Sequence, residues 1–187
     1  SYTGTRLQAK LAYYGSSFNN NDPSLTWQNP ITAPAFPGAV AGQLALPPDN
    51  QFHQLSATLG YQLAERTRAT ADIAIGRMLQ DQQFLAPTLN ATLAVPALPR
   101  TSLDGRVNTV NANLEVNSAV TDRLRVKAAY LYNDRNNQTP QSTYSWVTTD
   151  MFVAPSPRTN LPYGFTQDKV QLRADYKAAE RITTSAG

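Results

Sequence analysis

Apolar and polar residues alternate with a period of two in six segments of the chain. On one side of each segment the residues are Ala, Val, Leu, Ile or Tyr, and on the other side most are charged or carry amides or hydroxyls. Such alternation is typical of β-strands that separate an apolar from a polar environment. The segments are about 8–12 residues long, as tilted membrane-spanning strands are. We predict strands at residues 5–14, 52–63, 67–76, 106–116, 123–133 and 168–178.

The connections between these segments alternate between short and long. All 13 prolines lie in residues 15–51, 77–104 and 134–167. Proline is excluded from central strands because it cannot donate to the ladder, so we expect long irregular loops there. The turns near 64–66 and 117–122 are short. Short turns on one side and long loops on the other indicate an all-β fold, namely a segment of an antiparallel up-and-down transmembrane β-barrel.

A barrel of this kind turns its apolar side toward lipid and carries aromatic residues at both membrane interfaces. The residues predicted to face lipid are Leu11, Leu59, Ile73, Leu114, Val126 and Leu172. The predicted interfacial aromatics, close to the ends of the predicted strands, are Tyr13, Tyr61, Tyr130, Tyr132 and Tyr176.

The opposite side predicts a hydrated, net positive lumen. The candidate contacts to a partner are Arg6, Lys10, Arg68, Asp72, Glu115, Arg125, Lys127, Arg173, Asp175 and Lys177, with Arg123 on the same side. A basic wall of this kind could favour anions in an open pore. It could also hold an acidic protein or haem propionates through charge-assisted hydrogen bonds. A third interpretation is that these charges pair across strands and only stabilise the wall.

Composition excludes several classes of function. The chain has no cysteine, which rules out disulfides, thiolate metal sites, thiol catalysis and covalent haem attachment on this chain. The single histidine, His53, has no companion for metal binding, and no nucleotide-binding glycine motif or catalytic constellation occurs. The net charge of +3 does not indicate nucleic-acid binding, because the basic residues alternate with apolar ones over several strands. We expect no enzyme activity and no cofactor on this chain.

A soluble β-sandwich, for example an adhesin-like binding module, also alternates apolar and polar residues. Its core would favour bulky side chains, whereas the apolar side here contains no Phe and many Ala. Long structureless loops are also uncommon in compact domains. The pattern therefore favours the membrane barrel.

Several stretches resemble the MtrB/PioB family. They are Phe18–Asp22 with Ser24–Pro30, which resembles the first long loop of a hairpin, Asn160–Thr166 before a strand, and the turn Val120–Leu124 leading into Ala128–Asp134. The resemblance spans essentially the whole chain.

This resemblance implies a place in the bacterial outer membrane and a role as a sheath. Members of the family hold multihaem c-type cytochromes, so that electrons cross the membrane. The implied partners are periplasmic and extracellular multihaem cytochromes and membrane lipid, with haem on the partners only. Residues 1–187 would then be an internal part of a single larger barrel domain. The alternative within the membrane class is a general or anion-preferring porin.

Overall fold

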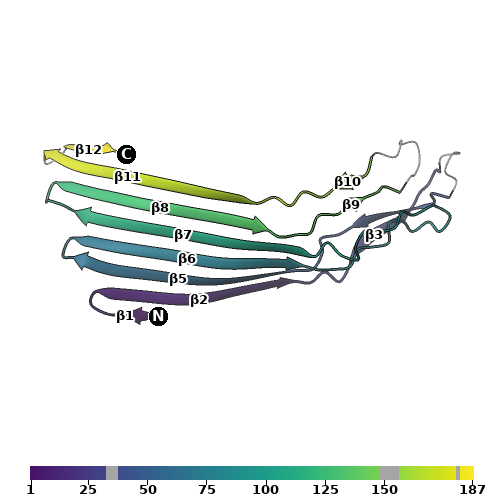
Figure 1. Cartoon of the computed structure of the whole chain (residues 1–187), viewed down its shortest axis with the longest axis horizontal. Coiled ribbons are helices and arrows are strands. Elements are labelled where there is room, and N and C mark those ends of the chain that lie inside the picture. Colours follow the sequence, from purple (N-terminus) through teal and green to yellow (C-terminus); the bar gives the residue numbers. More distant parts are fainter. Residues whose placement is uncertain (33–37, 148–155, 180–181) are drawn as a thin grey trace.

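The computed structural model describes residues 1–32, 38–147, 156–179 and 182–187. Its main feature is one antiparallel sheet of eight strands in the order β1-β2-β5-β6-β7-β8-β11-β12 (Figure 1). These strands are β1 (Tyr2–Thr3), β2 (Leu7–Phe18), β5 (Asn50–Ala64), β6 (Thr67–Gln80), β7 (Gly105–Ala119), β8 (Leu124–Asn137), β11 (Phe165–Ala179) and β12 (Ile182–Ala186). No helix in the described ranges has the length and apolarity to cross a membrane.

The six long strands β2, β5, β6, β7, β8 and β11 correspond to the six predicted ones. Each pairs in antiparallel fashion with the long strand before or after it in the chain, which gives the expected up-and-down order. The turns β5–β6 and β7–β8 are short and lie at one end of the sheet, whereas the connections β2–β5, β6–β7 and β8–β11 are long and lie at the other end (Figure 1). The sheet is open, as expected for part of a barrel.

The long strands extend further toward the long connections than the alternation predicts. β5 begins at Asn50, β6 ends at Gln80 and β8 ends at Asn137. Backbone pairing continues to the last residue of β2, where Phe18 is the partner of Asn50. In this region the row His53, Arg77 and Asn108 continues the apolar face with polar residues, while Phe52, Met78 and Val107 lie on the opposite face. The alternation of the spanning part is therefore not continued, although the ladder is.

The expectation of irregular loops is wrong for two of the three long connections. β3 (Ser24–Gln28) pairs with β4 (Ala41–Ala45) in the first, and β9 (Thr143–Tyr144) pairs with β10 (Arg158–Thr159) in the third. The prolines flank these short strands and do not interrupt them. Proline therefore marks the ends of the loop hairpins, as its missing N–H requires.

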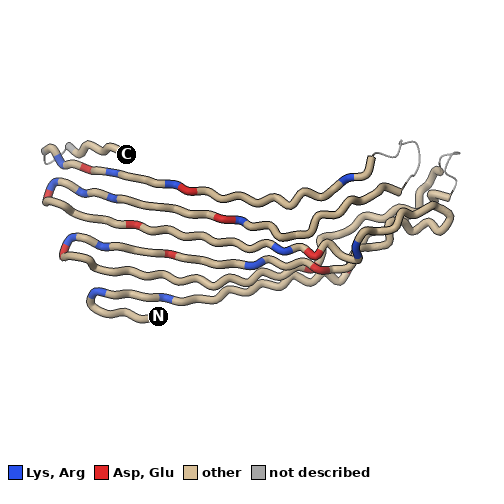
Figure 2. Tube along the Cα trace, in the orientation of Figure 1, with Lys and Arg blue, Asp and Glu red and all other residues tan. Residues whose placement is uncertain are grey.

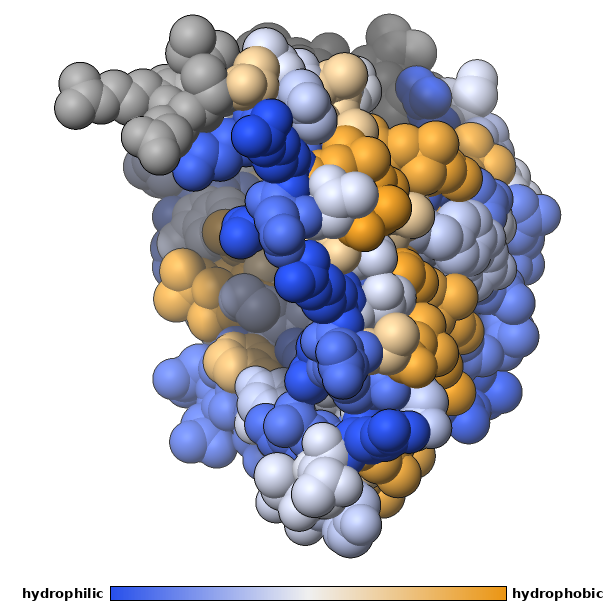
Figure 3. Space-filling model, turned by 90° about the vertical axis from the view of Figure 1, so that its left-hand side faces the viewer, coloured by the Kyte–Doolittle hydropathy of each residue, from blue (hydrophilic) through white to orange (hydrophobic). Residues whose placement is uncertain are grey.

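The long strands have no hydrophobic core of their own. Among the described residues only Ala39, Gly60, Gly76, Asn90, Val107 and Ala129 are buried, and none of them has a large apolar side chain. Seen from the short-turn end, hydrophobic side chains form a band along one side of the sheet (Figure 3). A single layer that exposes an apolar side needs another medium or another layer to cover it.

Candidate functional site

The register divides the long strands into an apolar face and a polar face. The apolar face contains every predicted lipid-facing residue; for example, Leu11 is the partner of Ala57, which is the partner of Ile73. Its side chains are open to the surroundings, with Leu11 at 68% and Leu172 at 65% exposure.

The apolar face carries a belt that spans six residue steps on β6 and eight on β5. On β5 it runs from Leu55 to Leu63, about 27 Å along the strand at ~3.4 Å per residue. The end of the belt nearest the long connections, its loop-side limit, is Tyr13 on β2 and Val170 on β11. Followed through the five strand pairings between them, this limit shifts by four residues. With strands ~4.8 Å apart, this shift corresponds to a tilt of about 30° and a height of about 23 Å. Outer-membrane barrels have tilts of roughly 35–45° and apolar bands of about 25 Å.

The five predicted interfacial tyrosines all lie on the apolar face. Tyr13 on β2 and Tyr132 on β8 lie at the loop-side limit of the belt, while the strands themselves continue beyond them. The Tyr13 hydroxyl and the Nδ1 atom of His53 are 2.6 Å apart, and Tyr130 donates a hydrogen bond to Asp168. Tyr61 on β5 and Tyr176 on β11 lie nearer the short turns.

The polar face brings predicted lumen residues from several strands into one row. Arg68 is the partner of Asn117, which is the partner of Lys127, which is the partner of Arg173. These side chains line a hollow of about 570 Å³ near the short turns. Figure 2 shows one group of Lys and Arg residues in this half of the sheet and a second group where the long strands meet the loops.

Each acidic residue predicted in the lumen is already engaged. Glu115 accepts from Lys127 with an Nζ–Oε2 distance of 2.8 Å, and Asp175 pairs with Arg173 at 3.0 Å. Asp72 accepts a hydrogen bond of 2.7 Å from the Thr58 hydroxyl. The other predicted basic residues form no ion pair with any described residue. Those residues are Arg6, Lys10, Arg68, Arg123, Arg125 and Lys177. The face therefore retains an excess of positive charge.

Arg68 takes its position because Gly60 leaves room for it. A β-carbon at Gly60 would lie 2.5 Å from a terminal nitrogen of the Arg68 guanidinium. The guanidinium extends across β5 and donates to the Gln8 side-chain oxygen at 2.6 Å. Glycine in this strand interior therefore serves a close side-chain approach, one of the recognised uses of glycine in strands.

The sheet is hollowed on its polar face. Besides the hollow above, a second of about 440 Å³ is lined by Thr58, Asp72 and Asn113, and a third of about 290 Å³ by Gln8 and Lys10. All three contain residues that the register places on the polar face.

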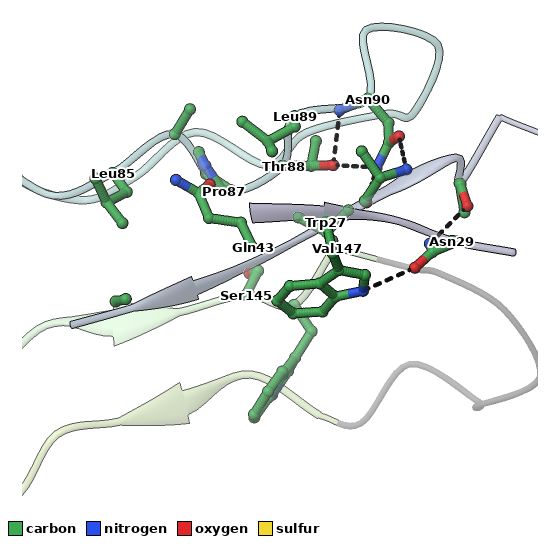
Figure 4. A pocket seen from close by; sticks show the side chains of 16 residues that line it. Trp27, Asn29, Gln43, Leu85, Pro87, Thr88, Leu89, Asn90, Ser145 and Val147 are labelled. Atoms are coloured by element: carbon green, nitrogen blue, oxygen red, sulfur yellow. Dashed lines mark hydrogen bonds between the residues drawn. The ribbon is translucent and has the colours of Figure 1, made fainter. Parts of the chain in front are cut away.

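The long connections form a further pocket, which the sequence analysis did not find. It has a volume of about 530 Å³ and lies between the β3–β4 hairpin, residues 85–90 and residues 145–147 (Figure 4). Asn90 is 6% exposed and holds the hairpin by accepting from the Val40 and Ala41 amides and donating to the Ala41 carbonyl. The link joins the first long connection to the second.

Trp27 forms one side of this loop pocket. Its indole lies across Gly42, where a β-carbon would come within 2.2 Å of the ring, and its Nε1 atom donates to Asn29 at 3.0 Å. The spacing of Trp27 and Gly42 in the sequence gives no hint of this contact, because it depends on the pairing of β3 with β4.

No group of three or more His, Asp or Glu side chains in the described part of the chain could hold a metal ion. The geometry is instead that of a two-faced sheet with strands of membrane-spanning length. A family described as "Putative outer membrane beta-barrel porin, MtrB/PioB" matches residues 1–187. The chain belongs to the MtrB/PioB family.

A relative supports this membership of the MtrB/PioB family. The "Outer membrane protein MtrB" of Shewanella baltica (strain OS185) is 30% identical over 177 residues, which cover 95% of this chain and 24% of the relative. The chain thus spans about a quarter of that relative's length. As expected from the sequence, it is an outer-membrane protein built as part of a β-barrel.

Proposed function

We propose that this chain forms part of the wall of an outer-membrane sheath that holds multihaem c-type cytochromes and lets electrons pass between the periplasm and the cell surface. The haems belong to the partners, because this chain has no cysteine for covalent attachment. The observation that carries the proposal is the hollowed, net positive polar face around Arg68, Lys127 and Arg173.

In this proposal the apolar face contacts lipid and the polar face lines the lumen. The belt height of about 23 Å supports this orientation, because it fits the hydrocarbon layer that outer-membrane barrels cross. The short turns lie on the periplasmic side and the long connections at the cell surface, as is usual for such barrels.

The polar face is suited to an acidic guest. Arg68 and Arg173 present planar guanidinium groups, which form paired hydrogen bonds with carboxylates. Haem propionates and surface Asp or Glu side chains of a cytochrome are carboxylates of this kind. Because Arg173 and Lys127 are each already paired with an acidic residue, only part of the row's charge is available. In this proposal the cytochrome is therefore held by several contacts of moderate strength, as expected when a large protein surface is bound.

The test uses the full-length barrel purified with its cytochromes. We expect the triple variant Arg68→Gln, Lys127→Gln and Arg173→Gln to lose haem in a salt wash. The haem left per barrel should fall about tenfold or more below that of the unaltered barrel, since the variant lacks three charged contacts in one row. A matched control replaces Arg100, Arg106 and Arg158, which lie in the second and third long connections or at their edge and not in this hollow, with Gln. Equal haem absorbance in the two variants would contradict the proposal.

The first long connection is proposed to form part of the rim that receives an extracellular cytochrome. Residues 19–49 can be replaced by a short Gly-Ser linker without shortening β2 or β5. We expect this variant to keep its periplasmic cytochrome and to lose extracellular cytochrome during co-purification. Unchanged recovery of the extracellular partner would exclude this connection from the rim.

An anion-preferring pore is the second candidate, because the same excess of basic residues on the polar face would favour anions. Single-channel recordings of the full-length barrel separate the two functions. A sheath with its cytochromes bound should conduct little, whereas a porin should show stable, anion-selective openings in the same preparation.

A further inference from the structure

A polar row lies on the apolar face immediately beyond the belt, on the loop side. His53 on β5 is the partner of Arg77 on β6, which is the partner of Asn108 on β7. Side chains at such positions point to the same side of the sheet, with β-carbons about 5 Å apart. The row follows Ile75, the last apolar residue before it on β6. A cation and two polar groups therefore lie directly at the edge of the apolar surface.

Arg77 has no acidic partner among the described residues. Its side chain is exposed, and it takes part in none of the ion pairs. Of the carboxylates near the row, Asp104 accepts from Arg106, and Asp134, at the level of Ile75, accepts from Thr166. Asp81, four residues after Arg77, forms no ion pair with it. The guanidinium donors of Arg77 thus remain open for an external anion.

His53 is held in place by Tyr13. The Tyr13 hydroxyl lies 2.6 Å from His53 Nδ1, and the two rings stack with centroids 6.2 Å apart. This contact occupies one ring nitrogen and leaves Nε2 as the second hydrogen-bonding atom. Because Tyr13 lies at the loop-side limit of the belt and His53 is the partner of Gly15, the imidazole is fixed just beyond that limit.

The level of the row agrees with that of lipid headgroups. Arg77 lies two residues beyond Ile75, about 7 Å along the strand or roughly 6 Å along the barrel axis after the tilt is included. The headgroup layer occupies about 5–8 Å outside the hydrocarbon on each side of a bilayer. Phosphate groups of lipids in the leaflet on the loop side lie in this layer.

We propose that His53, Arg77 and Asn108 bind the phosphate of a lipid headgroup in the outer leaflet. Arg77 supplies a bidentate pair of donors, while the Asn108 amide and His53 Nε2 supply the neighbouring hydrogen bonds. The adjoining belt holds the acyl chains, so the ligand is a membrane lipid and not free phosphate. The proposal rests on the orientation proposed above, with the apolar face toward lipid and the long connections at the cell surface, and is independent of any role in holding cytochromes.

The experiment is native mass spectrometry of the full-length barrel in detergent, mixed with a phosphorylated glycolipid or with the same glycolipid after phosphate removal. We expect the unaltered barrel to retain the phosphorylated form preferentially, and Arg77→Gln to reduce its retention roughly tenfold or more. The matched control is Lys169→Gln, which removes one positive charge from the polar face of the same sheet, where Lys169 is the partner of Leu131. Heat-dependent migration on gels checks that each variant is folded.

Three outcomes would overturn the proposal. The first is equal retention of the two glycolipids by the unaltered barrel, a result that does not depend on the folding of any variant. The second is a folded Arg77→Gln barrel that retains as much phosphorylated glycolipid as Lys169→Gln does. The third is displacement of the glycolipid by excess inorganic phosphate, which would indicate a general anion site.

Discussion

Placing a charge on the apolar face should destabilise the barrel, whereas the same charge one residue away should not. On β6 the belt runs from Ala69 to Ile75, so Ile73 lies one residue, or about 3 Å, from its centre. Arg near the midplane of a barrel costs about 2–4 kcal/mol. Part of this cost is relieved because a long Arg side chain can reach toward the interface. We therefore expect Ile73→Arg to cost about 2–3 kcal/mol, a change of roughly 30- to 150-fold in the folding equilibrium.

The matched control is Ala74→Arg, which introduces the same side chain on the polar face. Ala74 is the partner of Ser56 and Asn111 and borders the hollow of about 440 Å³, so a guanidinium there remains hydrated. Its expected cost is within about 0.5 kcal/mol. Full-length barrels folded into lipid vesicles across a urea series, followed by heat-dependent gel migration, give both values. Equal costs at the two positions, or a larger cost for Ala74→Arg, would refute the assignment of the two faces.

Three further predictions concern side chains that hold the loops and the polar face. Asn90→Ala should remove the acceptor of the Val40 and Ala41 amides at the start of β4 and weaken the hairpin by about 2–3 kcal/mol, measured as faster hydrogen exchange at those amides with unchanged exchange in β6. Gly42→Ala should displace the Trp27 indole and shift its fluorescence to longer wavelength; an unchanged spectrum would contradict the observed contact. Gly60→Val should push the Arg68 guanidinium away and lower haem retention like a mild form of the Arg68→Gln change, while an unchanged retention would show that its position is unimportant.

The architecture of the sheet could be predicted from the sequence because its chemistry repeats along every strand. Each spanning strand separates two media, so alternation at residues such as Leu59 and Thr58 identifies both the strand and its faces. The strand ends could not be predicted, since polar residues such as His53 and Arg77 replace the apolar ones on that face while hydrogen bonding continues to Asn50 and Gln80. The alternation of residue types reports the environment of the side chains, whereas the hydrogen-bonded ladder depends on backbone pairing.

The contacts that build the sites depend on the register between neighbouring strands, and the sequence of a single strand does not specify that register. The row of Arg68, Lys127 and Arg173 requires the pairing of four strands, and the contact between Tyr13 and His53 joins residues 40 positions apart. The link through Asn90 could not be foreseen either, because Asn in a Pro-rich segment is a common turn residue. Only the fold shows that its amide replaces missing backbone partners of a neighbouring hairpin.

The strict two-residue repeat of the long strands restricts how this protein can change in length. Loss of one residue within β6 would exchange the two faces from that point to the end of the strand, so that residues such as Ile73 would move to the polar face and Asp72 to the apolar face. Insertions or deletions of an even number of residues keep each side chain on its face of the sheet. They nevertheless shift the belt of that strand relative to the belt of the neighbouring strands. The pairing irregularities at Gln62/Ala64 and Lys177/Ala179, both next to turns, are places where a single-residue slip is already accommodated. We therefore expect insertions and deletions in the long connections and beside the turns, and none in the six long strands.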